Sequence, residues 1–193
     1  DKGIILSEGI KEQEGLIQNI VTTYFQSLNT RAHVSSHQAS SFITIKKWWV
    51  SDVRIGNGHK TWSMAPCTIA IEYDDANINL LRNFGIAITV KNQFDTPLLT
   101  ASNIFPQRLF ASIPRKGVFI CKLDSLPLIP GQYIVKLWVG NSSNTFLSIE
   151  DAGILEVNPT EVFGTGKIPR LSKHGAIIVN NEWDVLEPNA GVG

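Results

Sequence analysis

The spacing of apolar residues changes once along the chain, from a helical period to a strand period. Between residues 11 and 28, in "KEQEGLIQNIVTTYFQSL", apolar side chains recur at steps of one, three and four. This spacing places them along one side of a helix with 3.6 residues per turn. The sequence therefore predicts a short amphipathic helix near the N-terminus. Its apolar positions are Leu16, Ile17, Ile20, Val21, Tyr24, Phe25 and Leu28.

Residues 29–41, "NTRAHVSSHQASS", are polar and lack a period, which is typical of a linker. Beyond them the period becomes two, and no helical pattern separates the apolar runs. Many short strands without crossover helices favour an antiparallel sheet pair. The predicted fold is all-β, an immunoglobulin-like antiparallel β-sandwich. Strands are expected in "SFITIKKWWV", "CTIAIEY", "FGIAITVK", "PLLTA", "GVFICKLD", "GQYIVKLWVG", "TFLSI", "GILEVN" and "GAIIVN".

The change of pattern also predicts the domain organisation. Residues 1–41 form an N-terminal helix and linker, and residues 42–193 form the sandwich. Within each strand, alternate side chains face the core. The residues expected between the two layers include Ile69, Ile71, Ile86, Ile88, Val135 and Leu137.

Composition narrows the range of functions that the chain can have. The chain has 193 residues, 43% of them hydrophobic, so it can build a substantial core. Its formal net charge of zero provides no overall basic surface for nucleic acid. No apolar run approaches the roughly 18 residues of a membrane-spanning helix. The first residues, "DKGIILSEGIKEQEG", include neither an initiator methionine nor a signal-peptide pattern, so we expect a fragment of a longer protein.

The two cysteines, Cys67 and Cys121, have a spacing that suggests an immunoglobulin-type disulfide. Two features favour buried free thiols instead. No tryptophan lies between the cysteines to pack on a bridge, and Phe119 stands where antibody domains have a tyrosine two residues before the second cysteine. Unpaired cysteines commonly behave as small apolar residues.

Motifs for catalysis or metal binding are scarce. His33 and His37 are four residues apart but lie in the polar linker, where solvated side chains are expected. Glu72, Asp74 and Asp75 form the tightest acidic group, which we interpret as a strand end entering a turn rather than a catalytic or calcium site. The sequence contains no nucleophile elbow and no phosphate-binding loop. We therefore expect a protein without enzymatic activity, cofactor or metal.

Tryptophans are the most informative residues that remain. If Trp48 faces the core, alternation places Trp49 on the outer face, and the same rule places Lys136 and Trp138 together on an outer face. Aromatic rings beside polar groups are typical of saccharide sites, because sugar C–H faces pack on such rings. Burial against a loop or another subunit is the alternative. Trp138 and Lys136 are the first candidates, and Trp49 and Arg54 are weaker ones.

The order of these elements resembles the C-terminal carbohydrate-binding domain of Wzt-type ABC-transporter ATP-binding proteins. The matching phrases are "FGIAITVKN", the strand start at Gly131 and Tyr133, and a closing Gly175 followed by Trp183. The resemblance covers most of residues 42–186 and consists of strand patterns rather than reactive residues. This chain departs from the family pattern at Asp184, where the family often has a basic residue.

The resemblance implies a function, a partner and a location. The domain would bind the non-reducing end of a lipid-linked O-antigen polysaccharide and gate its export in Gram-negative bacteria. It would lie in the cytoplasm, at the inner face of the inner membrane, attached to the nucleotide-binding and transmembrane parts of the transporter. A structural or protein-binding sandwich is the alternative function.

The resemblance also implies a homodimer with exchanged C-terminal strands. The strand "GAIIVN" would then pair with the other protomer, and Trp183 would anchor the crossing. The alternative is an intramolecular strand, which requires residues 159–173 to fold back over their own sandwich.

Overall fold

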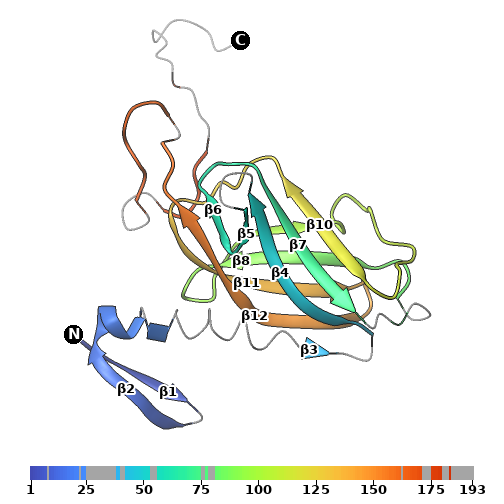
Figure 1. The fold of residues 1–193 in the computed structure, drawn as a ribbon, viewed down its shortest axis with the longest axis horizontal. Coiled ribbons are helices and arrows are strands. Elements are labelled where there is room, and N and C mark those ends of the chain that lie inside the picture. Colours follow the sequence, from blue (N-terminus) through green and yellow to red (C-terminus); the bar gives the residue numbers. More distant parts are fainter. Residues whose placement is uncertain are drawn as a thin grey trace, which may run out of the picture.

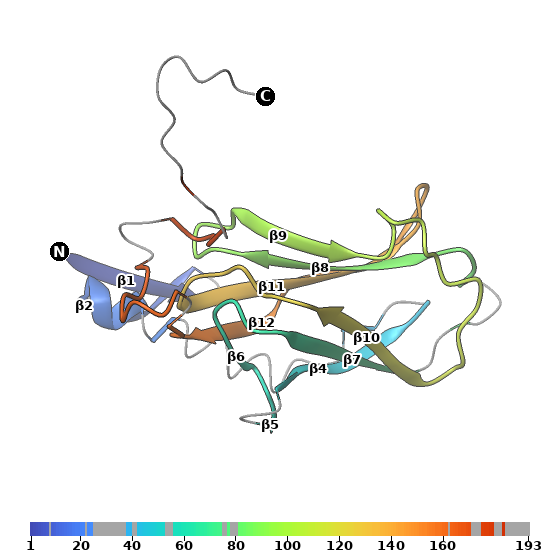
Figure 2. The same ribbon diagram turned by 90° about the horizontal axis from the view of Figure 1, so that it is seen from above.

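Two five-stranded sheets pack face to face in the computed structural model (Figures 1 and 2). The all-β sandwich predicted from the sequence is thereby confirmed. In Figure 1, β4, β7 and β10 lie in front of β8, β11 and β12 and cross them obliquely. The structure describes residues 1–7, 9–21, 23–24, 38–39, 42–52, 56–74, 77, 81–161, 163–170, 175–179 and 183.

The first sheet has the order β10-β7-β4-β3, with β5 also paired to β4. Its strands are β3 (Gln38–Ala39), β4 (Thr44–Asp52), β5 (Gly56–Gly58), β7 (Cys67–Asp74) and β10 (Gly117–Leu123). The second sheet has the order β6-β12-β11-β8-β9. Its strands are β6 (Lys60–Trp62), β8 (Gly85–Lys91), β9 (Pro97–Ser102), β11 (Gly131–Gly140) and β12 (Thr145–Asn158). Strand β6 runs parallel to β12, and the other described pairs are antiparallel.

Most predicted strands correspond to observed ones, but "TFLSI" and "GILEVN" form a single strand, β12. A register irregularity joins its two halves. From Val135 to Leu137, β11 advances two residues, whereas β12 advances four, from Ile149 to Gly153. The extra residues form a bulge, which bends a strand and redirects its side chains.

The core lies between the sheets, as the alternation predicted. Five of the six expected inter-layer residues are buried, and Ile86 is partly buried against the same cluster. Tyr133 is also fully buried, and its hydroxyl donates to the backbone oxygen of Ile129 at 2.7 Å. Burial raises the pKa of Tyr133 to about 12, so this hydroxyl keeps its proton at neutral pH.

The N-terminal segment differs from its prediction. Strands β1 (Lys2–Ser7) and β2 (Ile10–Leu16) form a hairpin, so the helix expected from residue 11 is wrong for residues 11–16. Helical residues follow at 17–21 and 23–24. Cross-strand pairing with residues 2–7 supplies hydrogen bonds that a local apolar period does not reveal.

A pair of glycines allows this helical segment to approach the hairpin. Gly3 and Gly15 lie opposite each other, and a Cβ on Gly3 would come within 2.9 Å of Ile17 and 3.1 Å of Ile20. Ile20 is consequently buried, whereas Leu16 is 64% exposed. Among the described residues, no helix is long and apolar enough to cross a membrane.

Residues 175–179, expected to form a strand, make only an isolated β-bridge, from Ile177 to Leu128 of the same chain. The backbone N–H of Ile129 donates to the oxygen of Ala176 at 3.0 Å, and that of Ile178 donates to the oxygen of Pro127 at 2.8 Å. This is the intramolecular pairing considered as an alternative above. Exchange of this segment between copies stays a prediction. Trp183, expected to anchor such an exchange, is 92% exposed in the single chain.

Both cysteines are free thiols, as predicted, but only Cys67 is buried, and Cys121 is partly exposed. Cys67 lies on β7 and Cys121 on the neighbouring strand β10, opposite Leu123 and Ile69 respectively. The bridge of an antibody domain joins two sheets, whereas these cysteines belong to one sheet.

Replacing the core residue Leu137 by alanine is expected to lower the free energy of unfolding by about 2–5 kcal/mol. Leu137 is only 1% exposed, so the truncation would leave a cavity. Ile120→Ala is the control, because Ile120 is 55% exposed and should cost less than about 1 kcal/mol. Urea unfolding measures both values, and equal losses would contradict the assigned facing of β11.

Candidate functional site

The outer face of the second sheet brings an aromatic ring together with hydroxyl groups. Trp138 on β11 lies between Ala87 on β8 and Ser148 on β12. One step along the same face, Lys136 lies opposite Thr89. The Thr89 and Thr100 hydroxyls are 3.0 Å apart, which extends the polar surface to β9. The first two candidates from the sequence, Trp138 and Lys136, therefore share one face.

Local structure fixes the position of the Trp138 indole beside Gly140. A Cβ on Gly140 would come within 2.5 Å of the six-membered ring, so the absence of a side chain there makes room for the indole. The indole N–H donates to the Thr145 hydroxyl at 3.1 Å. Ala87, opposite Trp138, is also small. The partly exposed ring is thus a fixed platform on the sheet surface.

The ammonium of Lys136 is paired with a carboxylate. Its Nζ lies 2.7 Å from Oε1 of Glu150, and the Ser148 hydroxyl donates to the same oxygen at 2.9 Å. The hydrogen bonds from Lys136 and Ser148 lower the pKa of Glu150. Lys136 therefore contributes a neutralised ion pair to the face rather than an uncompensated positive charge.

A second lysine lies beneath this pair. Lys91 is only 3% exposed, although it is on the outer face of β8. Its Nζ lies 2.5 Å from Asp95, 3.7 Å from Glu150 and 4.0 Å from Asp151. Burial lowers the pKa of Lys91, but these three carboxylates raise it more, so the net shift is upward. The β12 bulge carries both Glu150 and Asp151 to this position.

The weaker candidates lie elsewhere. Trp49 is on the outer face of the first sheet, opposite Ala70, and the Nζ of Lys47 lies 5.4 Å from its ring centroid. Trp49 and Trp138 are therefore on opposite faces of the sandwich and do not form one site. Arg54 lies outside the described residues.

The structure adds Glu150, Lys91, Asp95 and Thr145 to the candidate face. Glu150 contacts Lys136 and Thr145 contacts Trp138, whereas Lys91 contacts Glu150 and Asp95. Sequence analysis missed these contacts because bulges and turns have no periodic pattern. One signal was available for Asp95. The side chain of Asn92 accepts hydrogen bonds from the backbone N–H groups of Phe94 and Thr96, a turn that asparagine commonly initiates.

Two of the three acidic residues singled out in the sequence, Glu72 and Asp74, form ion pairs. Glu72 lies 3.2 Å from Lys47, and Asp74 lies 2.9 Å from Lys116. Asp75, His33, His37 and His174 lie outside the described residues. Among the residues the structure does describe, no group of three potential metal ligands occurs.

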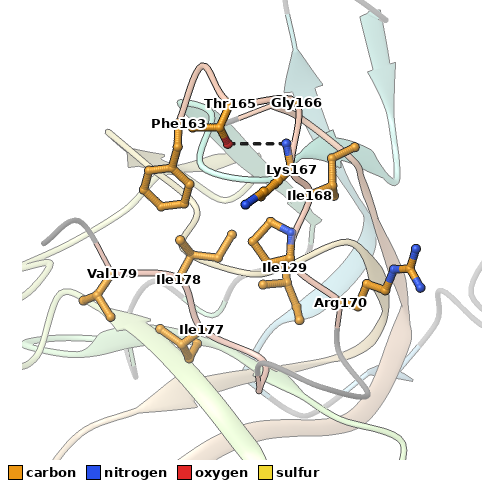
Figure 3. Close-up of a pocket in the computed structure, with 11 residues that line it drawn as sticks. Ile129, Phe163, Thr165, Gly166, Lys167, Ile168, Arg170, Ile177, Ile178 and Val179 are labelled. Carbon is orange, nitrogen blue, oxygen red and sulfur yellow. Dashed lines mark hydrogen bonds between the residues drawn. The ribbon is translucent and has the colours of Figure 1, made fainter.

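A hollow of about 960 Å³ lies at one end of the sandwich, between segment 163–170 and the C-terminal residues 177–179 (Figure 3). Its wall is mainly apolar and includes Ile129, Ile178 and Phe163. In Figure 3 the amino group of Lys167 points toward the space between these side chains, whereas Arg170 points away. This hollow depends on the C-terminal segment and is separate from the Trp138 face.

Comparison with solved structures identifies a similar fold. The chain matches a structure described as "Crystal structure of the C-terminal domain of wzt", with a TM-score of 0.56 and 14% sequence identity. The match covers 77% of this chain and 87% of the other. At this identity the likeness concerns the fold. No family model and no curated protein matches the sequence.

We predict that Lys136→Met raises the pKa of Glu150 toward its ordinary value. The substitution keeps the length of the side chain but removes the hydrogen bond that contributes most to the downward shift. Carboxyl-carbon NMR during a pH titration measures the pKa. Lys47→Met on the opposite sheet is the control and should leave it unchanged. A Glu150 pKa that does not respond to Lys136→Met would contradict the pairing.

Proposed function

We propose that this chain is a non-catalytic glycan-binding module that recognises the non-reducing end of a lipid-linked O-antigen polysaccharide. In this role it gates export by an ABC transporter, at the cytoplasmic face of the inner membrane. The observation that carries the proposal is the fixed Trp138 ring, which shares one sheet face with hydroxyl groups and the Lys136–Glu150 ion pair.

The geometry suits a sugar ring. The apolar C–H face of a pyranose packs on an exposed indole, and its hydroxyls need hydrogen-bonding partners at the edge of that ring. Ser148 lies opposite Trp138 on β12 and donates to Glu150, and Thr89 and Thr100 lie on the other side, on β8 and β9. These groups provide both donors and acceptors. No step of this proposal requires bond chemistry or a cofactor.

The charges favour a neutral sugar. Lys136 and Lys91 contribute two positive charges, while Glu150, Asp151 and Asp95 contribute three negative ones, so the group sums to −1 at neutral pH. An acidic sugar would approach carboxylates without an excess of positive charge to stabilise it. A neutral terminal residue avoids this repulsion.

The fold supports the same proposal. Two independent features agree: the resemblance in the order of sequence elements, and the likeness in fold to the C-terminal domain of Wzt. The parts of the proposal that concern the transporter, its polysaccharide and the cellular location rest on that resemblance.

We also propose a homodimer with exchanged C-terminal strands. In the single chain, residues 176–178 pair with residues 127–129 through two backbone hydrogen bonds. Exchange would form the same pairing with a second copy across a two-fold axis. Segment 163–170, which connects β12 to this strand, is mostly exposed and has no strand pairing of its own.

A protein-binding sandwich is the second candidate, and one observation favours it. Val118 and Ile120 on β10 are 44% and 55% exposed and lie on the outer face of the first sheet. Ile120 lies opposite Ala70 on β7, which is buried, and Ala70 lies opposite the partly exposed Trp49 on β4. Such a patch is typical of a contact with another protein. Its position on the face opposite Trp138 makes the two candidates separable by mutation.

Trp138→Ala is expected to weaken binding of the recognised O-polysaccharide at least about tenfold, a loss of roughly 1.4 kcal/mol. The partly exposed ring stabilises little of the fold, so thermal unfolding should change only slightly. Trp49→Ala removes a tryptophan from the other face and serves as the control. Calorimetric titration with a panel of O-polysaccharides, intact or lacking the terminal residue, measures the affinities. Lost stability with unchanged affinity would assign Trp138 to packing.

Deleting residues 174–193 is expected to convert the dimer into a monomer or an aggregate. The deletion removes the segment that pairs with residues 127–129 and leaves their backbone groups unpaired. Light scattering of the purified chain, before and after the deletion, gives the mass in solution. A truncated chain that remains a well-behaved dimer would rule out strand exchange as the basis of association.

A further inference from the structure

The sandwich is open along one side, where the edge strand of one sheet faces the edge strand of the other. Strand β9 pairs with β8, and β10 pairs with β7, and neither has a second described partner. A cleft of about 470 Å³ lies between them. This volume falls within the usual range for small-molecule sites. The cleft is distinct from the Trp138 face, which is on the outer surface of the second sheet.

The floor of the cleft is part of the hydrophobic core. Ile86, Phe110, Cys121 and Leu123 pack against the core cluster, yet each remains partly exposed because the cleft reaches them. Ile88, the next core-facing residue after Ile86 on β8, is only 3% exposed. The two sheets therefore leave an apolar space at this edge that the described side chains do not fill.

The rim of the cleft is positively charged. Arg108 and Lys122 line it, and no aspartate or glutamate is found among the described residues that line it. Within the part of the chain that the structure describes, neither side chain forms an ion pair. Most other described lysines of the sandwich, such as Lys47 and Lys60, contact a carboxylate. The cleft thus combines an apolar interior with two cations that have no described carboxylate partner, Arg108 on the loop and Lys122 at the outer-face side of β10.

The loop that carries Arg108 has a defined shape. The Asn103 side chain accepts a hydrogen bond from the Ile86 N–H at 2.8 Å and donates to the Arg108 backbone oxygen at 2.8 Å. The backbone N–H of Arg108 donates to the backbone oxygen of Asn103 at 2.9 Å. These bonds fix the start and end of the loop to β8, so the rim position of Arg108 is set by the fold.

We propose that this cleft binds an amphiphilic anion, a single apolar chain that carries one acidic head group. The chain would lie on Ile86, Phe110 and Leu123, and the head group would accept charge-assisted hydrogen bonds from Arg108 and Lys122. A sugar does not suit the same space, because its hydroxyls would lose water against an apolar floor. The site is independent of the glycan face, and the proposal does not rest on the proposed function.

The head group is a carboxylate or a phosphate ester, and both have the required charge. Octanoate and octyl phosphate serve as probes, used below the concentrations at which they aggregate. Octyl glucoside has the same chain with a neutral head group and is the control ligand. Comparison of the two anions identifies which head group the rim accepts more strongly.

Cys121 provides a direct measurement, because its thiol lines the cleft. Burial raises the pKa of the Cys121 thiol, so alkylation by iodoacetamide is followed at mildly alkaline pH. Cys67 is 6% exposed and serves as an internal standard for unfolding. On the full chain, saturating octanoate or octyl phosphate should slow modification of Cys121 at least about fivefold and leave Cys67 unmodified.

Two variants test the contribution of the rim. Arg108→Gln and Lys122→Gln should each raise the anion concentration needed for half-maximal protection by about tenfold, the effect of one charge-assisted hydrogen bond. Lys60→Gln removes one positive charge from β6, the opposite edge strand, and should leave protection unchanged. A stronger effect of anions than of octyl glucoside supports the site.

Three results would overturn the proposal. The first is no protection of Cys121 by either anion, and the second is equal protection by octyl glucoside. The third is an equal loss of protection in Lys60→Gln, which would mean that the anions respond to overall charge rather than to the rim.

Discussion

The β12 bulge is the constraint on which the candidate face depends. Four residues of β12 span the distance that two residues of β11 cover, so backbone groups in the bulge fall out of the regular pairing. Trp48 stabilises this arrangement from the opposite sheet. Its buried indole donates to the Ala152 oxygen at 2.6 Å, while its ring stacks on His59 with centroids 4.3 Å apart. A carbonyl left unpaired there would cost about 1–3 kcal/mol. One hydrogen bond between the sheets therefore supports the irregularity that directs Glu150 toward Lys136.

The electrostatics of the face follow from that placement. Glu150 is held between Lys136 and Lys91, and its lowered pKa keeps it ionised to lower pH than an ordinary glutamate. A carboxyl group with a depressed pKa in the folded state adds stability above its unfolded pKa and loses it as the pH falls through the folded pKa. Because Glu150 is 59% exposed, water screens the pair and its contribution to folding is small. Its main effect is geometric, since its oxygens are held beside Lys136 and Ser148 on the face that carries Trp138.

The sequence was sufficient for the architecture and for the first half of the candidate site. Alternation in "GQYIVKLWVG" placed Val135 and Leu137 inside and Lys136 and Trp138 outside, because a strand with one buried face has a strict period of two. The same reasoning could not join "TFLSI" to "GILEVN", since a bulge interrupts the period within one strand. It also failed for residues 11–16, where pairing with residues 2–7 outweighed a helical spacing of apolar residues. Glu150 and Lys91 are far apart in sequence, and only the tertiary fold brings their charges together.

The C-terminal segment shows why a single chain and an exchanged dimer can share the same contacts. Residues 176–178 contribute two backbone hydrogen bonds and one buried side chain, Ile178, to the edge at residues 127–129. An identical segment from a second copy would satisfy the same groups, so the local interaction energy is equal in both arrangements. The difference lies in the connecting residues and in protein concentration, because closure within one chain costs loop entropy and association costs the freedom of a second molecule. Residues 176–178 therefore use this edge within the single chain, and in the proposed dimer the connecting segment and the protein concentration would decide which copy provides it.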